Sequence, residues 1–210
     1  MNFSELTLNE FVARLGSGDP APGGGGACAL AGCLGAALGN MVAHLTVGRK
    51  RYVSAWGEME SVIREEEELQ REFLDLISLD AVLFEPLSKA YSMPGSTPAE
   101  KEVRETVMEE ALKNACRVPL RIMEKTCRTL ELTEIVAREG STLAVSDAGD
   151  AAALCRAALQ GAALNVYINT KLMKNRELAE EYNSRAERML ERYVPLADLI
   201  YERVGRQLRK

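Results

Sequence analysis

The chain has 210 residues, of which 47% are hydrophobic, 5% aromatic and 27% charged. This length suits one domain with a sizeable core, so we expect a single domain over residues 1–210. The scarcity of aromatic residues favours closely packed helices over a sheet, which draws on β-branched and aromatic side chains. A net charge of -5 and an isoelectric point near 5.2 argue against a nucleic-acid binder.

The five cysteines are odd in number and lack the paired Cys-x-x-Cys spacing of a zinc site. We interpret them as reduced, buried small hydrophobic residues, which favours a cytoplasmic protein over a secreted one. The first residues, Met1 to Glu5, form neither a basic segment nor an apolar signal core. We therefore expect a cytoplasmic protein without a metal site.

Thr7 and Glu10 have the spacing of a capping box, which predicts a short helix from there to about Leu15. The segment 20–26 follows, with two prolines that end the preceding helix and four consecutive glycines that leave backbone N–H groups bare. At a helix start such groups favour an anion. The candidates for binding a ligand carboxylate or phosphate are therefore Gly23, Gly24 and Gly25. A flexible linker into a core helix explains the same residues.

An apolar stretch of small residues, 27–47, comes next and predicts a buried helix. A membrane span is an alternative, because the stretch is about long enough and its glycines are spaced for close helix contact. Asn40 and His44 within the stretch favour a core helix instead, so no membrane partner is expected. The glycines of this stretch that would permit close approach by a neighbouring helix are Gly32, Gly35 and Gly39.

Long charged helices are predicted over 53–90 and 98–138. They could form a protruding antiparallel hairpin that packs against its counterpart in a second subunit. The run Glu65 to Glu68 is interpreted as a solvated stretch, because adjacent residues on a helix point in different directions and no histidine accompanies them.

Two further helices are predicted over about 148–173 and 176–207, the first of them capped by Ser146 and Asp147. The first shares the small, apolar character of 27–47, so these two helices should pack together as the central pair. No strand pattern is present. The predicted fold class is therefore all-α: a multihelical array with two buried small-residue helices and a long α-hairpin.

Polar residues within apolar helical stretches are costly to bury, which makes them the best candidates for a site. His44 is the only histidine, although a structural role explains it as well. Asp80 is an acid in an otherwise apolar patch, whereas capping is a sufficient explanation for Asp147. Asn165 and Asn169 lie one helical turn apart. Their amides could hydrogen-bond a heterocycle or satisfy the backbone of a neighbouring helix.

Together these residues resemble the cyclodeaminase/cyclohydrolase family of folate enzymes. The likeness extends in order over nearly the whole chain, through the segments 22–25, 45–52, 80–84, 146–147 and 165–169. The chain departs from the family pattern where Gly26 replaces a serine, Gly95 a lysine and His44 an asparagine, and where Gly140 to Leu143 lacks two amides.

The resemblance implies a homodimer formed through a helical hairpin. It also implies a reaction at the one-carbon unit of a tetrahydrofolate derivative, with no cofactor beyond that substrate. A cyclodeaminase closes a 5-formimino group onto the second nitrogen and expels ammonia. A cyclohydrolase adds water to the 5,10-methenyl bridge and opens it to 10-formyltetrahydrofolate.

Both reactions need proton transfers, and a carboxylate in a partly apolar site can provide them because desolvation raises its pKa. The resemblance implies Asp80 as the proton shuttle and Asp147 as the group that orients the pterin or the cationic bridge. His44, which stands where the family has an asparagine, is a further catalytic candidate from the residues alone. Arg49 and Lys50, with the glycine-rich helix start, would hold the glutamate carboxylates. A catalytically silent dimer that binds folate or a partner protein is the alternative.

Overall fold

The protein, a computed structural model that describes residues 2–209, contains only helices and connecting segments within that range. Its α-helices there are α1 (Leu8–Leu15), α2 (Gly24–His44), α3 (Trp56–Tyr91), α4 (Pro98–Ala115), α5 (Arg117–Glu139), α6 (Val145–Thr170) and α7 (Arg176–Leu208). Three short 3₁₀ helices accompany them within this range: η1 (Phe3–Glu5) precedes α1, η2 (Lys50–Ala55) precedes α3 and η3 (Thr142–Ala144) precedes α6. The predicted all-α class is confirmed.

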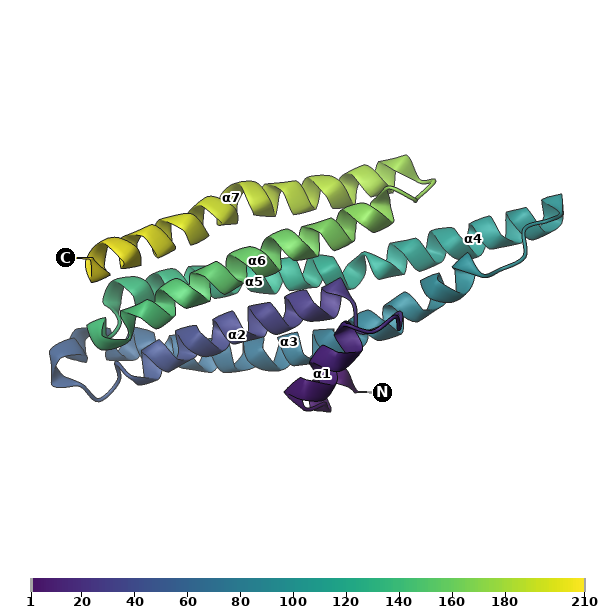
Figure 1. Ribbon diagram of the computed structural model, residues 1–210. Coiled ribbons are helices and arrows are strands. Elements are labelled where there is room, and N and C mark those ends of the chain that lie inside the picture. Colours follow the sequence, from purple (N-terminus) through teal and green to yellow (C-terminus); the bar gives the residue numbers. More distant parts are fainter. Residues whose placement is uncertain (1, 210) are drawn as a thin grey trace.

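The helices form two layers, as Figure 1 shows. α2 and α6 run antiparallel in the near layer, whereas α3 and α5 lie behind them. α7 packs along α6 on the side away from α2, and α1 lies on the near side beside the start of α2. The prediction that the two small-residue helices form the central pair is therefore confirmed.

Glycines at every seventh position of α2 set its contact with α3. A Cβ atom on Gly32, for example, would lie 2.6 Å from Cε1 of Phe73, closer than side chains can pack. The three facing pairs are Gly25 with Asp80, Gly32 with Phe73 and Gly39 with Glu66. Because the facing residues are seven apart on both helices, all three contacts belong to one antiparallel register. This register carries Asp80 to the N-terminus of α2.

Close approach also governs the contact between α2 and α6. A Cβ atom on Gly161 would lie 2.6 Å from Sγ of Cys28, and one on Gly35 would clash with Sγ of Cys155. All five cysteines are free thiols, and all except the partly buried Cys28 are buried, in agreement with the sequence-based interpretation.

The hairpin is shorter than expected. α5 lies within the core, where Ile122, Met123 and Leu130 are fully buried, so it does not stand out from the bundle. Only α4 and the last turns of α3 extend beyond the other helices (Figure 1). A small second cluster that includes Leu87 and Leu112 holds the base of this extension.

The capping box at Thr7 and Glu10 is confirmed, since each side chain bonds the backbone of the other residue. The predicted start of α6 is wrong by about one turn. Its N-cap is Ala144, because η3 runs directly into the helix, and Asp147 therefore lies in the first turn instead of at the cap.

By length and composition alone, α2 and the stretch Thr142–Thr170 would qualify as membrane spans. Core helices of soluble proteins pass the same test. In the α2 window 56% of the residues are buried inside the fold, by α3, α5 and α6.

Glu66 is a carboxyl group enclosed in the core. Its side chain is fully buried, and among the described residues neither of its oxygens has a hydrogen-bond partner. Burial and the nearby Glu65 raise the pKa of Glu66 to about 9, against a weaker opposing effect of Arg128. The group is therefore protonated and neutral at pH 7. The prediction that the whole run Glu65 to Glu68 is solvated is wrong at this position, where Gly39 leaves room for the carboxyl.

The replacement Glu66→Gln tests this protonation. The folded protein keeps the Glu66 proton between its ordinary pKa of 4.5 and about 9, whereas the unfolded chain loses it above 4.5. The free energy of unfolding of the wild type should therefore fall as pH rises through that window. Urea unfolding at pH 5, 7 and 8.5 should show this fall reduced in Glu66→Gln and retained in the exposed control Glu68→Gln. The same pH dependence in all three proteins would contradict a neutral buried Glu66.

Candidate active site

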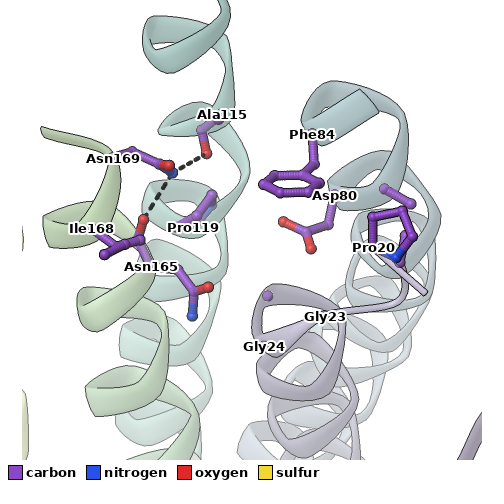
Figure 2. A pocket seen from close by; sticks show the side chains of 13 residues that line it. Pro20, Gly23, Gly24, Asp80, Phe84, Ala115, Pro119, Asn165, Ile168 and Asn169 are labelled. Carbon is purple, nitrogen blue, oxygen red and sulfur yellow. Dashed lines mark hydrogen bonds between the residues drawn. The ribbon is translucent and has the colours of Figure 1, made fainter. Parts of the chain in front are cut away.

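A cavity of about 190 Å³ opens at the N-terminal end of α2 (Figure 2). It is lined by Pro20, Ala21, Gly23, Gly24, Gly25, Asp80, Ala81, Phe84, Ala115, Pro119, Asn165, Ile168 and Asn169. Pockets for drug-sized ligands usually measure about 300–1,000 Å³. The cavity can therefore hold a ring system, whereas the rest of a larger ligand would lie outside it.

The Asp80 carboxylate points into this cavity from α3 (Figure 2). The backbone N–H of Gly26 donates a hydrogen bond to Oδ2 of Asp80 over 3.1 Å. Gly23, the N-cap of α2, has no side chain to bond the helix start, so Asp80 performs this capping from the neighbouring helix.

Burial raises the pKa of Asp80 to about 6, and the hydrogen bond from Gly26 lowers it by a smaller amount. A carboxyl group that titrates this close to neutrality can both accept and return a proton during a reaction. The environment predicted for Asp80, an acid in partly apolar surroundings, is thus the one in which the structure places it.

Gly23, Gly24 and Gly25 line the cavity together with Asp80. A Cβ atom on Gly25 would overlap the Asp80 carboxylate, so this glycine is needed for the approach of α3. The helix start therefore faces the chain's own carboxylate, where the sequence suggested a place for a ligand carboxylate. A second anion at that position would be repelled.

Asn165 and Asn169 form the opposite wall, on α6 (Figure 2). Nδ2 of Asn169 donates to the backbone oxygens of Ala115 and Asn165, over 3.3 and 2.9 Å. Nδ2 of Asn165 donates to the backbone oxygen of Gly161 over 2.9 Å, and its amide lies against Gly24. Both amides satisfy backbone groups, as one of the two explanations expected, and these bonds fix them in the cavity wall.

The other predicted site residues lie at the far end of the subunit. His44 is the last residue of α2 and is exposed, with Nε2 4.0 Å from Oε1 of Glu67. Arg49 and Lys50 follow it and are exposed, and Asp147 is in the first turn of the antiparallel α6. At 1.5 Å per residue, about 30 Å of α2 separates this end from Asp80.

Hydrogen bonds join the two loops at this far end. The N–H of Ser141 donates to Oγ1 of Thr46 over 2.8 Å, and the N–H of Thr142 donates to the hydroxyl of Tyr52 over 3.0 Å. Within one subunit, the structure brings Asp80, the glycines and the asparagines together. It does not bring His44, Arg49, Lys50 or Asp147 to the same cavity.

Several apolar residues of the cavity wall were not predicted. Phe84 lies one helical turn after Asp80 on α3, and this spacing alone could have indicated it. Pro119 and Ile168 come from other helices, and only the packing of those helices reveals them. Across residues 2–209, the side chains of His, Cys, Asp and Glu form no cluster of three or more that could hold a metal ion.

Known proteins match the chain over most of its length. The family described as formiminotransferase-cyclodeaminase matches residues 7–188. The methenyltetrahydrofolate cyclohydrolase of Methylorubrum extorquens is 40% identical over 198 residues, which are 94% of this chain and 95% of that protein. The formimidoyltransferase-cyclodeaminase of Gallus gallus is 32% identical over 184 residues, 88% of this chain but only 34% of that longer protein.

A solved structure matches the fold as well. Formiminotetrahydrofolate cyclodeaminase from Thermotoga maritima superposes with a TM-score of 0.80 at 30% identity, and the match covers 98% of this chain and 96% of that one. Sequence and fold thus agree over the same residues that form the cavity. The chain belongs to the formiminotransferase-cyclodeaminase family.

Proposed function

We propose that the protein is a folate one-carbon enzyme that hydrolyses 5,10-methenyltetrahydrofolate to 10-formyltetrahydrofolate. The observation that carries this proposal is Asp80, a partly buried carboxyl group with a pKa of about 6 that faces a cavity lined by two amides. Support for hydrolysis comes from the 40% identical cyclohydrolase, which aligns over nearly the full length of both chains.

In this reaction the Asp80 carboxylate takes a proton from water while the water oxygen bonds to the methenyl carbon. The carbon becomes tetrahedral, and the electron pair of its C=N bond moves to nitrogen. The bond from this carbon to ring nitrogen N5 then breaks, and Asp80 returns its proton to that nitrogen. The hydroxyl proton leaves to solvent as the formyl carbonyl forms, so that one proton is released overall.

Asn165 and Asn169 would orient the bicyclic ring of the substrate, since fixed amides can pair with the polar edge of a heterocycle. Phe84 offers an aromatic surface beside Asp80 (Figure 2). Apart from water, this chemistry requires no small molecule besides the tetrahydrofolate derivative, and we place the enzyme in the cytoplasm as a homodimer.

Cyclodeamination is a second candidate, because the solved structure with a TM-score of 0.80 is a formiminotetrahydrofolate cyclodeaminase. The same carboxyl group would then protonate the leaving ammonia. A catalytically silent folate-binding dimer is not favoured, because Asp80 and both asparagines stand together in the cavity.

Turnover of the two substrates decides between these activities. We expect the purified protein to remove the near-ultraviolet absorbance of 5,10-methenyltetrahydrofolate faster than buffer alone. We expect little release of ammonia from 5-formiminotetrahydrofolate. Rapid ammonia release with no acceleration of methenyl hydrolysis would contradict the proposal and establish the deaminase instead.

The replacement Asp80→Asn tests the proton shuttle. The amide keeps an oxygen for the Gly26 N–H but cannot exchange a proton, so the rate should fall by roughly 10² to 10⁴-fold with little change in affinity. In the wild type kcat/KM should decrease as pH falls below about 6, where Asp80 becomes protonated. This decrease at low pH should be absent from the residual kcat/KM of Asp80→Asn. A full rate in Asp80→Asn would exclude Asp80 as the shuttle.

Gly25→Ala tests the contact that positions Asp80. The added Cβ overlaps the carboxylate, so Asp80 must move, and we expect a large loss of kcat. Gly26→Ala is the matched control, because its Cβ would meet Pro22 at an ordinary 3.5 Å. Circular dichroism checks that both variants fold. Equal rates in the two folded variants would show that the position of Asp80 does not matter.

A further inference from the structure

This inference rests on the proposed function. We propose that the active site is completed by a second copy of the chain, which packs its α2 and α6 against the same helices in antiparallel orientation. This arrangement brings Arg49 and Lys50 of the partner subunit beside the Asp80 cavity, where they bind the carboxylates of the substrate's glutamate tail.

The uncovered side of α2 carries an apolar seam. Its residues are Ala27, Ala31, Leu34, Leu38, Met41 and Leu45, spaced alternately four and three apart. Leu34, Met41 and Leu45 are 48%, 40% and 39% exposed. Alternating spacing of four and three is the pattern of a coiled-coil seam, in which each apolar side chain fits between residues of a facing helix. Within residues 2–209 no helix packs along this side of α2, because α3, α5 and α6 pack elsewhere around it and α1 is not among its main packing partners.

The neighbouring α6 widens this apolar face. Leu164 and Ile168 are 67% and 57% exposed, and Ala153 and Ala157 continue the row toward the helix start. Two helices about 30 Å long and 10 Å wide present about 600 Å², close to the roughly 800 Å² per partner of a stable interface. α1 lies on the same near side, beside the start of α2 (Figure 1).

The apolar face is continuous with the cavity, since Ile168 belongs to both. The cavity also lacks what a folate needs: none of the described residues that line it is Lys, Arg or His. A volume of about 190 Å³ leaves the anionic tail of the substrate outside the subunit. Arg49 and Lys50 lie at the opposite end of the same face, about 30 Å away.

A two-fold axis exchanges these two ends. The midpoint of the seam from Ala27 to Leu45 lies at the level of Ala36. Antiparallel pairing centred there puts the partner's Leu45, the residue that ends its α2, level with Ala27. The partner's loop that carries Arg49 and Lys50 therefore lies at the end of the seam where the cavity opens. Helices with this spacing cross at only about 20°, so they stay close along their length. The same symmetry completes both sites of the dimer.

The partner's Asp147 lies at the same end of its subunit as Arg49, so the symmetry moves it toward the cavity as well. The extension formed by α3 and α4 is the alternative dimer surface, where Val103 is 56% exposed.

Subunit complementation tests the shared site. Asp80→Asn removes the proton shuttle, and the double variant Arg49→Ala/Lys50→Ala removes the cations and should raise KM about tenfold or more. Each protein alone is then nearly inactive at low substrate concentration. After joint refolding, each mixed dimer contains one intact site, and activity should reach about a quarter of the wild-type value. No recovery, or a double variant with wild-type KM, would overturn the proposal.

A second mixture serves as the matched control, because here a shared site predicts less activity than separate sites. Wild type is refolded with an equal amount of a subunit that carries all three replacements. A shared site predicts about a quarter of wild-type activity, because mixed dimers have no intact site. Sites contained in single subunits would give about half, which contradicts the proposal.

Sedimentation separates this inference from the proposed function. If the wild type turns over no folate substrate, the proposed function fails, and the interface is still tested by mass. The wild type and Val103→Glu should sediment as dimers of the 23.0 kDa chain at micromolar concentration, whereas Leu34→Glu should sediment as a folded monomer. A monomeric wild type, or a Leu34→Glu protein that remains dimeric, would overturn the interface.

Discussion

The heptad contact between α2 and α3 is the constraint on which the rest of the structure depends. Three glycines on α2 admit three side chains of α3, and because both sets are seven residues apart, the register of the helices has no freedom. A slip by one residue would press Phe73 against a side chain instead of Gly32. The same register fixes Asp80 at the start of α2, so the packing of the core determines where the carboxylate of the site lies.

Two of the three α3 side chains that face these glycines end in carboxyl groups, and their different surroundings determine the pKa of each. Glu66 is enclosed by the bundle, and burial raises its pKa to about 9, so it remains neutral. Asp80 occupies the equivalent contact two heptads away, at the end where a cavity opens, and it accepts a hydrogen bond from Gly26. Its pKa of about 6 allows exchange with a substrate. The same contact between a glycine and a carboxyl group thus produces one acid that stays neutral and one that can exchange a proton.

Much of the fold and part of the site could be predicted from the sequence, because the signals are local. Apolar periodicity and capping residues indicated the helices, and an acid within an apolar patch indicated Asp80. The burial of Glu66 could not be predicted, since it depends on a glycine of another helix. Arg49 and Asp147 were grouped with Asp80 by family resemblance, whereas the antiparallel course of α2 and α6 separates them within one subunit. Relations between helices, and between subunits, are not encoded in local patterns.

The central claim is that packing against the glycine-rich helix start gives Asp80 the pKa of a proton shuttle. Titration of the side-chain carboxyl signals by carbon-13 NMR tests it most directly, with the Asp80 signal identified by its loss in Asp80→Asn. The account predicts a midpoint near pH 6 for this signal in the free wild-type protein. A midpoint at the ordinary aspartate value of 3.8 would contradict it.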